Sequence, residues 1–429
     1  MSKEIKILIL NIHSDRNAGD YALSRMSISQ LKTVFPNCSV TLSMNDPDSY
    51  TGDLPVVQSP IVWIKRQQQW EWGKILLFIF GSLIPTIIWR IWKKSFLYFT
   101  PTILREWVST YISADIIVSA AGGYQYSSGK GLTFLLLNFT LLLSKFGKKP
   151  LYFLPQSFGP YYHWWEKIIT RYVCNFSQIV MVREPVSYQN LINCSVTPHK
   201  LILHPDIAFG FIGAPQHEAS KWFNSIGLDI IHDRPFLGMT IINWRAFSSR
   251  FHRQDEYENA ISTLIEFFIN EYNGKVIILP QTWGPTEAED DRLIGIKIEQ
   301  KLKHLKPNLI VITQPIHPKL LQTIFGMMDA VVGTRMHSNI FALTHGTPAL
   351  PIGYLHKSVG IAKMLGIEEW VIDINEINNE VLLQRFSDFW DKREIIRSNL
   401  KANIPNIISD SKRFGEIISD DYNKHYKNK

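Results

Sequence analysis

The sequence predicts an α/β protein made of two halves, each with its own parallel sheet, that face one another across a cleft. Short apolar, β-branched runs alternate with helix-spaced segments along most of the 429 residues, a pattern typical of buried parallel strands with crossover helices. The hexapeptide 155–160 (Pro-Gln-Ser-Phe-Gly-Pro) recurs as 280–285 (Pro-Gln-Thr-Trp-Gly-Pro), each time at the end of an apolar run. Between residues 210 and 235 the rhythm is lost and glycine and proline gather, which favours a domain boundary there.

We therefore expect an N-terminal Rossmann-like domain over residues 1–212, a C-terminal one over 235–405, and a polar tail over 406–429 that frays from Asp420. The strands expected in the first half are Ile5–Leu10, Val40–Leu42, Asp115–Ser119, Leu151–Leu154, Ile179–Val182 and Leu201–Leu203. Those expected in the second half are Phe236–Ile242, Val276–Leu279, Leu309–Ile312, Ala330–Val332, Pro348–Ile352 and Val371–Ile374.

The composition limits the partners and the compartment. The formal charge is +7, and the basic residues are dispersed rather than gathered in one run, which suits an anionic substrate or a membrane surface. Zinc-finger spacings and RNA-binding aromatic motifs are absent from the sequence, so no nucleic-acid partner is expected. Three scattered cysteines without a CxxC pair indicate a reducing, cytoplasmic location and no structural zinc. The apolar run Ile7–Leu10 is too short for a signal peptide and is interpreted as the first buried strand.

Residues 61–99 interrupt the α/β rhythm with an apolar, tryptophan-rich insertion. The run Ile75–Trp89 has no charged residue, but it is shorter than the roughly 20 residues that span a bilayer, and Pro85 would kink it. Tryptophans and cations flank the run, as in segments that lie in the membrane interface. A helical hairpin packed on the domain is the alternative interpretation. The flanking residues are Trp63, Trp70, Trp72, Trp89, Trp92, Lys65, Arg66, Lys74, Arg90, Lys93 and Lys94.

The most informative stretch is the turn that follows the expected strand Ala330–Val332. Gly333 ends the strand and a helical pattern starts near Ser338, so the turn directs backbone N–H groups and the positive end of a helix dipole at its mouth. Arg335 adds a forked cation and His337 a side chain that exchanges protons near neutrality. The alternative is that Arg335 pairs with a carboxylate and His337 only caps the helix.

Other strands also end in polar or glycine-rich clusters, which is where ligands bind in doubly wound sheets. Asn17-Ala18-Gly19-Asp20 follows the first strand, without a dinucleotide-binding fingerprint. Lys357 stands at a helix start and is a second candidate for an anion. The acidic run from Glu287 to Asp291 fits the preference for negative first turns and needs no catalytic role. Further clusters of this kind are Gly122-Gly123, Gln156 with its neighbours, Arg183-Glu184-Pro185 and His204-Pro205-Asp206.

In their order along the chain, these motifs resemble the polysaccharide pyruvyl transferase family. The resemblance runs from about residue 5 to 375 and leaves out the insertion at 61–99. It is carried by Asn17–Asp20, Gly122-Gly123, the two Pro-Gln clusters, Arg183-Glu184-Pro185, Gly333–His337, Gly346-Thr347-Pro348 and Tyr354–Lys357.

The resemblance implies two Rossmann-like domains facing across a cleft, similar to type B glycosyltransferases. It also implies transfer of a pyruvyl group from phosphoenolpyruvate to two hydroxyls of a sugar, in a cell-surface polysaccharide such as an exopolysaccharide or in its precursor. The products would be a cyclic ketal and inorganic phosphate. No cofactor and no metal is expected beyond this donor substrate.

The expected chemistry distributes roles over the candidate residues. The donor carries a phosphate and a carboxylate, so Arg335 with the helix start at Ser338 would bind one group, and Arg183 or Lys357 the other. His337 is the expected general acid. The acceptor base is Asp20 or His163, which the sequence leaves open. The residues expected near the acceptor glycan are Asn17, Gly122, Gly123, Gln156, His163 and Gln281.

Two rival functions stay open at this point. In a nucleotide-sugar glycosyltransferase, Arg335 would hold the diphosphate, and a carboxylate of the second domain should hold the ribose. Asp329 precedes its strand and so lies at the wrong end for that role. A non-catalytic glycan-binding protein of the same fold is the other rival. For the enzyme we expect a cytoplasmic location, at the inner face of the membrane if the segment Ile75–Trp89 makes peripheral contact with lipid.

Overall fold

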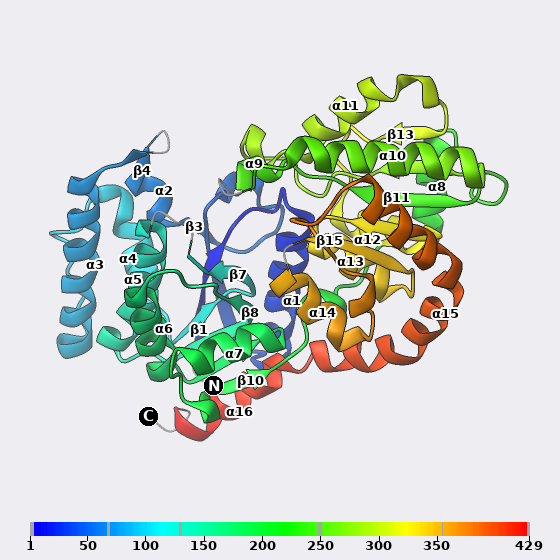
Figure 1. Cartoon of the computed structure of the whole chain (residues 1–429). Helices are drawn as coiled ribbons and strands as arrows, with labels where there is room; N and C mark the ends of the chain where they lie inside the picture. The colour runs from blue at the N-terminus through cyan, green and yellow to red at the C-terminus, as the bar shows by residue number, and fades with distance from the viewer. Residues whose placement is uncertain (1–3, 67–68, 128–130, 248–250, 354, 427–429) are drawn as a thin grey trace. The chain divides into compact units, whose positions relative to one another are not determined.

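The computed structural model describes residues 4–66, 69–127, 131–247, 251–353 and 355–426. The chain divides into two compact units, each built on a parallel sheet flanked by helices (Figure 1). Unit 1 comprises Met1–Asp15, Leu23–Ile207 and Ser411–Lys429. Unit 2 comprises Arg16–Ala22 and Ala208–Asp410. The α/β class with two Rossmann-like units is confirmed, while the short segment Arg16–Ala22 belongs to unit 2 although it follows the first strand of unit 1.

The sheet of unit 1 has, within the described residues, the order β10-β9-β8-β6-β1-β2-β3, and β7 also pairs with β8. Every pairing in it is parallel. Strands β1, β6 and β8 are mostly buried runs such as Ile-Ile-Val, because helices cover both faces of a doubly wound sheet. The strands are β1 (Ile5–Ile12), β2 (Cys38–Met44), β3 (Val56–Gln58), β6 (Ile116–Ser119), β7 (Gly122–Gln125), β8 (Leu151–Phe158), β9 (Ile179–Val182) and β10 (Leu201–Leu203).

The sheet of unit 2 has the order β13-β12-β11-β14-β15-β16 in the part of the chain that the structure describes. Numbered within the unit this is 3-2-1-4-5-6, the Rossmann order, whose direction of winding reverses between the first and fourth strands. That reversal lies between β11 and β14, which pair in parallel from Leu237 to Thr240. The strands are β11 (Phe236–Thr240), β12 (Lys275–Ile278), β13 (Leu309–Val311), β14 (Ala330–Gly333), β15 (Ala349–Gly353) and β16 (Ile372–Asp373).

Helices connect and cover the strands. Helix α1 (Ala18–Val34) starts in unit 2 and continues in unit 1. The other helices of unit 1 are α2 (Pro60–Ile64), α3 (Trp72–Trp92), α4 (Arg105–Ser113), α5 (Leu132–Gly147), α6 (Trp164–Phe176), α7 (Pro185–Asn193) and α16 (Phe414–His425). Unit 2 has α8 (Gln216–Ser225), α9 (Trp244–Phe247), α10 (Gln254–Tyr272), α11 (Asp291–Lys301), α12 (Pro318–Gly326), α13 (Met336–Thr344), α14 (Leu355–Leu365) and most of α15 (Asn379–Ser411). A short antiparallel pair, β4 (Lys65–Arg66) with β5 (Gln69–Trp70), precedes α3.

Two sequence expectations about the first half need correction. Strand β8 does not end at Leu154 but continues to Phe158, so the first Pro-Gln cluster lies within a buried strand. In the second half, by contrast, β12 ends at Ile278, before Pro280. Gly122 and Gly123 begin β7, a short strand that was not among the expected ones and that pairs with β8.

The chain end is also more ordered than the sequence suggested. The prediction of fraying from Asp420 is wrong as far as His425, where α16 ends. Phe414 and Ile418 are buried, and the Tyr152 hydroxyl of β8 donates a hydrogen bond to Asp421 at 2.7 Å. The segment is polar in composition, but it forms an amphipathic helix, α16, that packs on unit 1.

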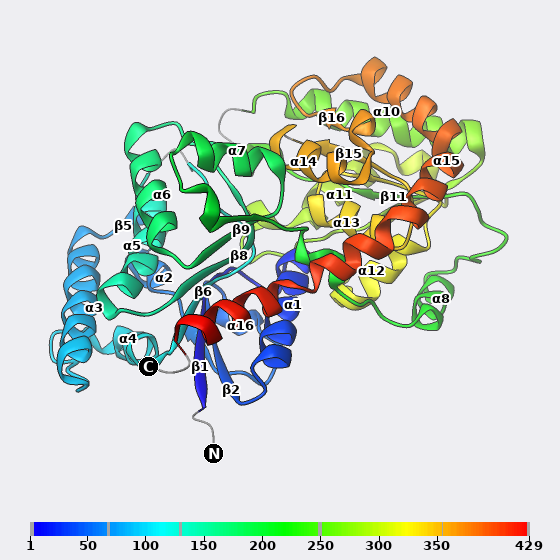
Figure 2. The same cartoon turned by 90° about the horizontal axis from the view of Figure 1, so that it is seen from below.

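The apolar insertion forms the 21-residue helix α3. The expectation that it is too short to span a bilayer was wrong, because the helix extends past the uncharged run at both ends, and Pro85 lies inside it. It is the one helix among the described residues that is long and apolar enough to cross a membrane, by length and composition only. One face packs on α2, α4 and α5, at the outer edge of unit 1 in both views (Figure 2).

Candidate functional site

The first motif of the chain is held by unit 2, where it pairs with the second Pro-Gln cluster. The Ala18 N–H donates to the Gln281 carbonyl at 2.9 Å, and the Trp283 N–H donates to the Arg16 carbonyl at 3.1 Å. Asn17 and Thr282 form an antiparallel bridge between these two bonds. The structure therefore brings together two motifs that lie more than 250 residues apart in the sequence.

Asn17 caps the helix that starts at Ala18. Its Oδ1 accepts hydrogen bonds from the N–H groups of Gly19 at 2.9 Å and Asp20 at 3.4 Å, so the side chain satisfies two of the N–H groups that a helix start leaves open. Asp20, predicted as a catalytic carboxylate, lies in this first turn and is partly exposed. The cap fixes the direction in which the helix start points, and with it the position of Asp20.

His337 lies directly against this helix start. A β-carbon added at Gly19 would come within 2.1 Å of His337 Nδ1 and 2.4 Å of its Cγ. Only glycine leaves room for the imidazole there, so the Asn17–Asp20 motif and the Arg335–His337 turn form one site in unit 2. The first turn of α1 thus packs against the imidazole ring of His337, which belongs to the first turn of α13.

Thr240 holds the Arg335–His337 turn in place at the point where the winding of the sheet reverses. Its hydroxyl accepts from the N–H groups of Thr334 at 3.1 Å and Arg335 at 3.2 Å, and it shares a hydrogen bond of 2.8 Å with the Ser338 hydroxyl. Ser338 is buried and also bonds to the Arg335 carbonyl at 2.6 Å. Ser338, predicted to bind the donor, therefore uses its hydroxyl to shape the turn.

Arg335 forms an ion pair with a buried carboxylate. Its Nε and Nη2 donate to both oxygens of Asp291, at 2.5–3.2 Å. The same carboxylate accepts from the N–H groups of Gln281 at 3.2 Å and Thr282 at 3.1 Å. Burial raises the pKa of the Asp291 carboxyl, while the Arg335 charge and these hydrogen bonds oppose the rise. The pairing that the sequence left open as an alternative for Arg335 is present.

Asp291 is the residue that sequence reasoning missed. It was assigned only to a favourable negative first turn, and it does start α11. Its side chain is 3% exposed, and it fixes the Nε–Nη2 edge of the guanidinium, which orients the plane of Arg335. No sequence signal links the two residues, since they lie 44 positions apart.

Gln281 and Thr282 bring buried polar groups to the same place. The side-chain amide of Gln281 is 1% exposed, and neither its nitrogen nor its oxygen has a hydrogen-bond partner among the described residues. The Thr282 hydroxyl is also buried and has no hydrogen-bond partner among the described residues. A buried polar group without a partner costs about 1–3 kcal/mol, so these groups are candidates for contact with a bound substrate.

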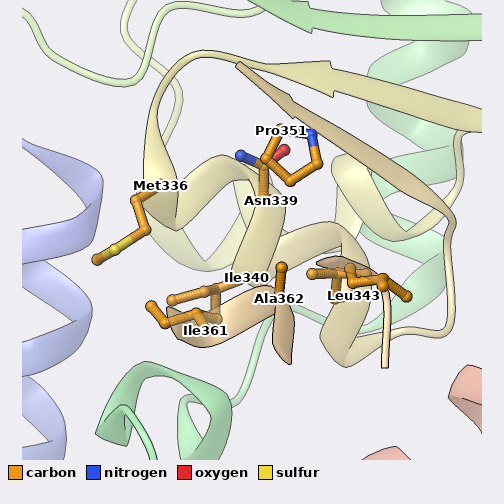
Figure 3. Close-up of a pocket in the computed structure, with 8 residues that line it drawn as sticks. Met336, Asn339, Ile340, Leu343, Pro351, Ile361 and Ala362 are labelled. Atoms are coloured by element: carbon orange, nitrogen blue, oxygen red, sulfur yellow. The ribbon is translucent and has the colours of Figure 1, made fainter. Parts of the chain in front are cut away.

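Behind the turn lies a small apolar pocket that is part of the packing of unit 2 (Figure 3). Its volume, about 10 Å³, is that of a single water, far too small for a sugar or a phosphorylated acid. In Figure 3 the side chains of Ile340 and Ile361 lie side by side, with Asn339 next to Pro351. The residues around the pocket are Met336, Asn339, Ile340, Leu343, Pro351, Ile361, Ala362 and Ile367.

In unit 1 a row of polar side chains crosses the strands where that sheet also reverses its winding. The Ser119 hydroxyl at the end of β6 accepts from Asn11 Nδ2 at 3.2 Å and from Gln156 Nε2 at 3.3 Å. Gln156 is fully buried, and its oxygen has no partner among the described residues. Gly122 has a φ of +143° and pairs with Gln156 in register, with Gly123 following it. Three of the predicted acceptor residues, Gly122, Gly123 and Gln156, thus lie together.

The remaining predicted residues lie elsewhere. Arg183 is 2% exposed; its Nε donates to the Ser157 hydroxyl and its Nη1 to Asp206, each at 2.8 Å, which fits a structural role. His163 is exposed at the start of α6, with its ring stacked on Trp165 at 5.6 Å. Lys357 lies in the first turn of α14, and its side chain is outside the described residues.

This chain is similar to one protein family over most of its length. The family model described as polysaccharide pyruvyl transferase matches residues 17–356. The amylovoran biosynthesis protein AmsJ of Erwinia amylovora is 23% identical over 406 residues, which cover 92% of this chain and 94% of AmsJ.

Among solved structures, a putative UDP-N-acetylglucosamine 2-epimerase from Listeria monocytogenes superposes with a TM-score of 0.60 at 11% identity, covering 99% of this chain and 97% of that one. The UDP-GlcNAc 2-epimerase of Neisseria meningitidis gives 0.57 at 14% identity, with coverage of 98% and 100%. Anabaena HepE in complex with UDP gives 0.56 at 13% identity, with coverage of 97% and 100%. At these identities the likeness concerns the fold alone.

Proposed function

The chain belongs to the polysaccharide pyruvyl transferase family, and from that premise we propose that it transfers the pyruvyl group of phosphoenolpyruvate to a sugar of a cell-surface polysaccharide or of its precursor. It is a transferase of polysaccharide biosynthesis. The proposed products are a cyclic ketal and inorganic phosphate, and no cofactor or metal enters the proposed reaction.

The observation that carries the proposal is the meeting of the Asn17–Asp20 and Arg335–His337 motifs in unit 2. The positive dipole ends of two helices, α1 and α13, favour an anion at this place. Arg335 adds a cation held in a fixed plane by Asp291. Phosphoenolpyruvate carries a phosphate and a carboxylate, and such a site suits a small ligand with two anionic groups.

The reaction needs one proton on carbon and two carbon–oxygen bonds. His337 gives a proton to the methylene carbon of the enol, while a first sugar hydroxyl adds to the adjacent carbon and loses its proton to a base. Asp20, next to Gly19, is the base we propose in unit 2. The second hydroxyl then displaces phosphate, which leaves with the second hydroxyl proton. One diol and one phosphoenolpyruvate thus give one ketal and one phosphate.

The acceptor we propose is a lipid-linked glycan at the inner face of the membrane, with the protein itself in the cytoplasm. The exposed apolar residues of α3 support a peripheral contact with lipid. In unit 2, Gln281 is the residue proposed to contact the glycan, since its buried side-chain amide has no hydrogen-bond partner among the described residues and amide groups suit sugar hydroxyls.

The proposal is tested by offering the protein two donors. Phosphoenolpyruvate or a UDP-hexose is incubated with the protein and either lipid-linked glycans of the producing cells or a panel of p-nitrophenyl hexosides, and phosphate release and acceptor mass are followed. We expect release of phosphate that requires both phosphoenolpyruvate and an acceptor, with the acceptor gaining the mass of pyruvate less one water.

Variants make the test specific to the site. Arg335→Ala and His337→Ala should abolish transfer, while His345→Ala, at the other end of α13, should retain it. Hexose transfer from the UDP-sugar would establish the rival glycosyltransferase. Full activity in both Arg335→Ala and His337→Ala would refute the site.

A further inference from the structure

Helix α3 is apolar on two opposite faces. The inner face is buried in unit 1, where Ile75 and Phe78 belong to the core and the Phe78 ring meets Trp107 and Phe139 edge to face. Gly81 lets the chain after the helix approach closely, and the Thr100 hydroxyl donates to its carbonyl at 2.5 Å. The buried positions run from Ile75 to Thr86, so this face is already occupied by the protein.

The outer face is apolar, and its side chains are exposed towards both ends of the helix and partly exposed at Ile84 in between. Leu76, Leu77 and Phe80 are 52–56% exposed, and Ile91 is 61% exposed. Leu77, Phe80, Ile84, Ile87 and Ile91 follow the spacing of a single helix face. Large contiguous apolar patches are rare on soluble proteins and mark interaction surfaces.

Aromatic and basic side chains frame this face. Trp72 and Trp92 are exposed at its two ends, at 71% and 64%. Arg90, Lys93 and Lys94 are exposed at the C-terminal end of the helix. The exposed rings of Phe96, Tyr98 and Phe99 follow at once and pack on one another. Tryptophan belts and flanking cations are what a helix at a lipid headgroup layer carries.

We propose that the outer face of α3, with the aromatic cluster Phe96–Phe99, docks unit 1 on an anionic lipid bilayer with the helix axis in the membrane plane. A spanning helix would have to leave α5, to which its inner face is bound. Arg90, Lys93 and Lys94 complement anionic headgroups, whereas the same face of a second copy of this chain would bring further cations and no compensating anions. The docking rests on the proposed function in one respect: an enzyme that modifies a lipid-linked acceptor has to work at the membrane surface.

The test is co-sedimentation of the full chain with vesicles of phosphatidylcholine alone or mixed with phosphatidylglycerol. We expect binding to the anionic vesicles that weakens with salt. The double variant Leu77→Glu/Phe80→Glu should lower the partition coefficient by more than about tenfold. Lys93→Gln and Lys94→Gln should each lower it by about fivefold. The control variant is Ile395→Glu. It changes an isoleucine of α15 that is at least as exposed as Leu77 and Phe80, and it should leave vesicle binding unchanged.

Other outcomes would overturn the proposal. These are absence of binding to anionic vesicles, equal binding of the Leu77→Glu/Phe80→Glu variant, or a dimer in sedimentation velocity that this variant abolishes without any vesicle binding. Retention of the bound protein through an alkaline carbonate wash would show a spanning helix instead. Docking and catalysis fail separately: His337→Ala should still bind vesicles, and the Leu77→Glu/Phe80→Glu variant should still modify a water-soluble acceptor.

Discussion

At the residue scale, the contact between Gly19 and His337 defines the site. We predict that Gly19→Ala lowers kcat by about 100-fold, because the added methyl must displace the imidazole and misplacement of a reacting group by about 1 Å has an effect of that size. Gly73→Ala is the matched control, since a β-carbon there meets nothing within 4 Å. Steady-state kinetics on both variants decide the matter, and equal activity would show that the His337 position is not critical.

The Arg335–Asp291 pair leads to a pH-dependent prediction. Burial raises the pKa of Asp291 and Arg335 opposes this, so Arg335→Met should raise that pKa further. A folded-state pKa above the unfolded value contributes stability at low pH that is lost as the pH rises through it. We expect the free energy of unfolding of the variant to match that of the wild type at about pH 4. Near neutrality it should be lower than that of the wild type by about 3 kcal/mol.

Urea unfolding at the two pH values measures this difference. Adding Asp291→Asn to Arg335→Met removes the uncompensated carboxyl and should restore most of the stability at neutral pH. A loss of stability that is equal at both pH values, or larger in acid, would contradict the assignment.

The sequence alone predicted the Arg335–His337 turn and its helix start, because a strand, a glycine and a helical pattern are local signals. It could not predict that Arg335 is paired, since Asp291 lies at the start of another element, helix α11. The predicted roles of Ser338 and Arg183 met the same difficulty: their sequence positions suit an anion, but tertiary partners already take the Ser338 hydroxyl and the Arg183 Nε and Nη1.

At the element scale, α3 allows a comparison of two phenylalanines on opposite faces of one helix. Phe78 is fully buried and Phe80 is 56% exposed. We predict that Phe78→Ala lowers the free energy of unfolding by about 3–5 kcal/mol, whereas Phe80→Ala changes it by less than about 0.5 kcal/mol. Thermal and urea unfolding of the two variants provide the measurement. Similar losses for both would mean that the outer face is also packed.

Most strands were predicted because buried parallel strands are continuous apolar runs, and β9 and β10 match their predicted bounds. Strand β8 was predicted too short because Pro155 and Gln156 are typical of turns, yet the strand continues through them. The length of α3 was underestimated because charged residues at its ends were counted against the helix. Composition shows where a run is apolar, but tertiary packing decides where the element ends.

At the scale of the whole molecule, the last helix is part of the first unit. Helix α16 contributes Phe414 next to His204, with ring centroids 6.1 Å apart, and Tyr422 next to Phe35 at 5.7 Å. We predict that a chain ending at Ser411 loses soluble expression or unfolds at a lower temperature, because buried aromatic surface of unit 1 is exposed. A chain ending at Tyr426 is the control and should behave as the full chain. Unchanged stability of the shorter chain would contradict the role of α16.

The central claim is that the Gly19–His337 site transfers a pyruvyl group, with His337 protonating the enol carbon. The most direct measurement is the reaction run in D2O with phosphoenolpyruvate and the glycan acceptor, followed by mass spectrometry and NMR of the product. The wild type should release phosphate and give a ketal whose methyl group carries one deuterium, and His337→Gln should give neither. A product that contains a transferred hexose, or deuterated ketal formed at the full rate by His337→Gln, would contradict the claim.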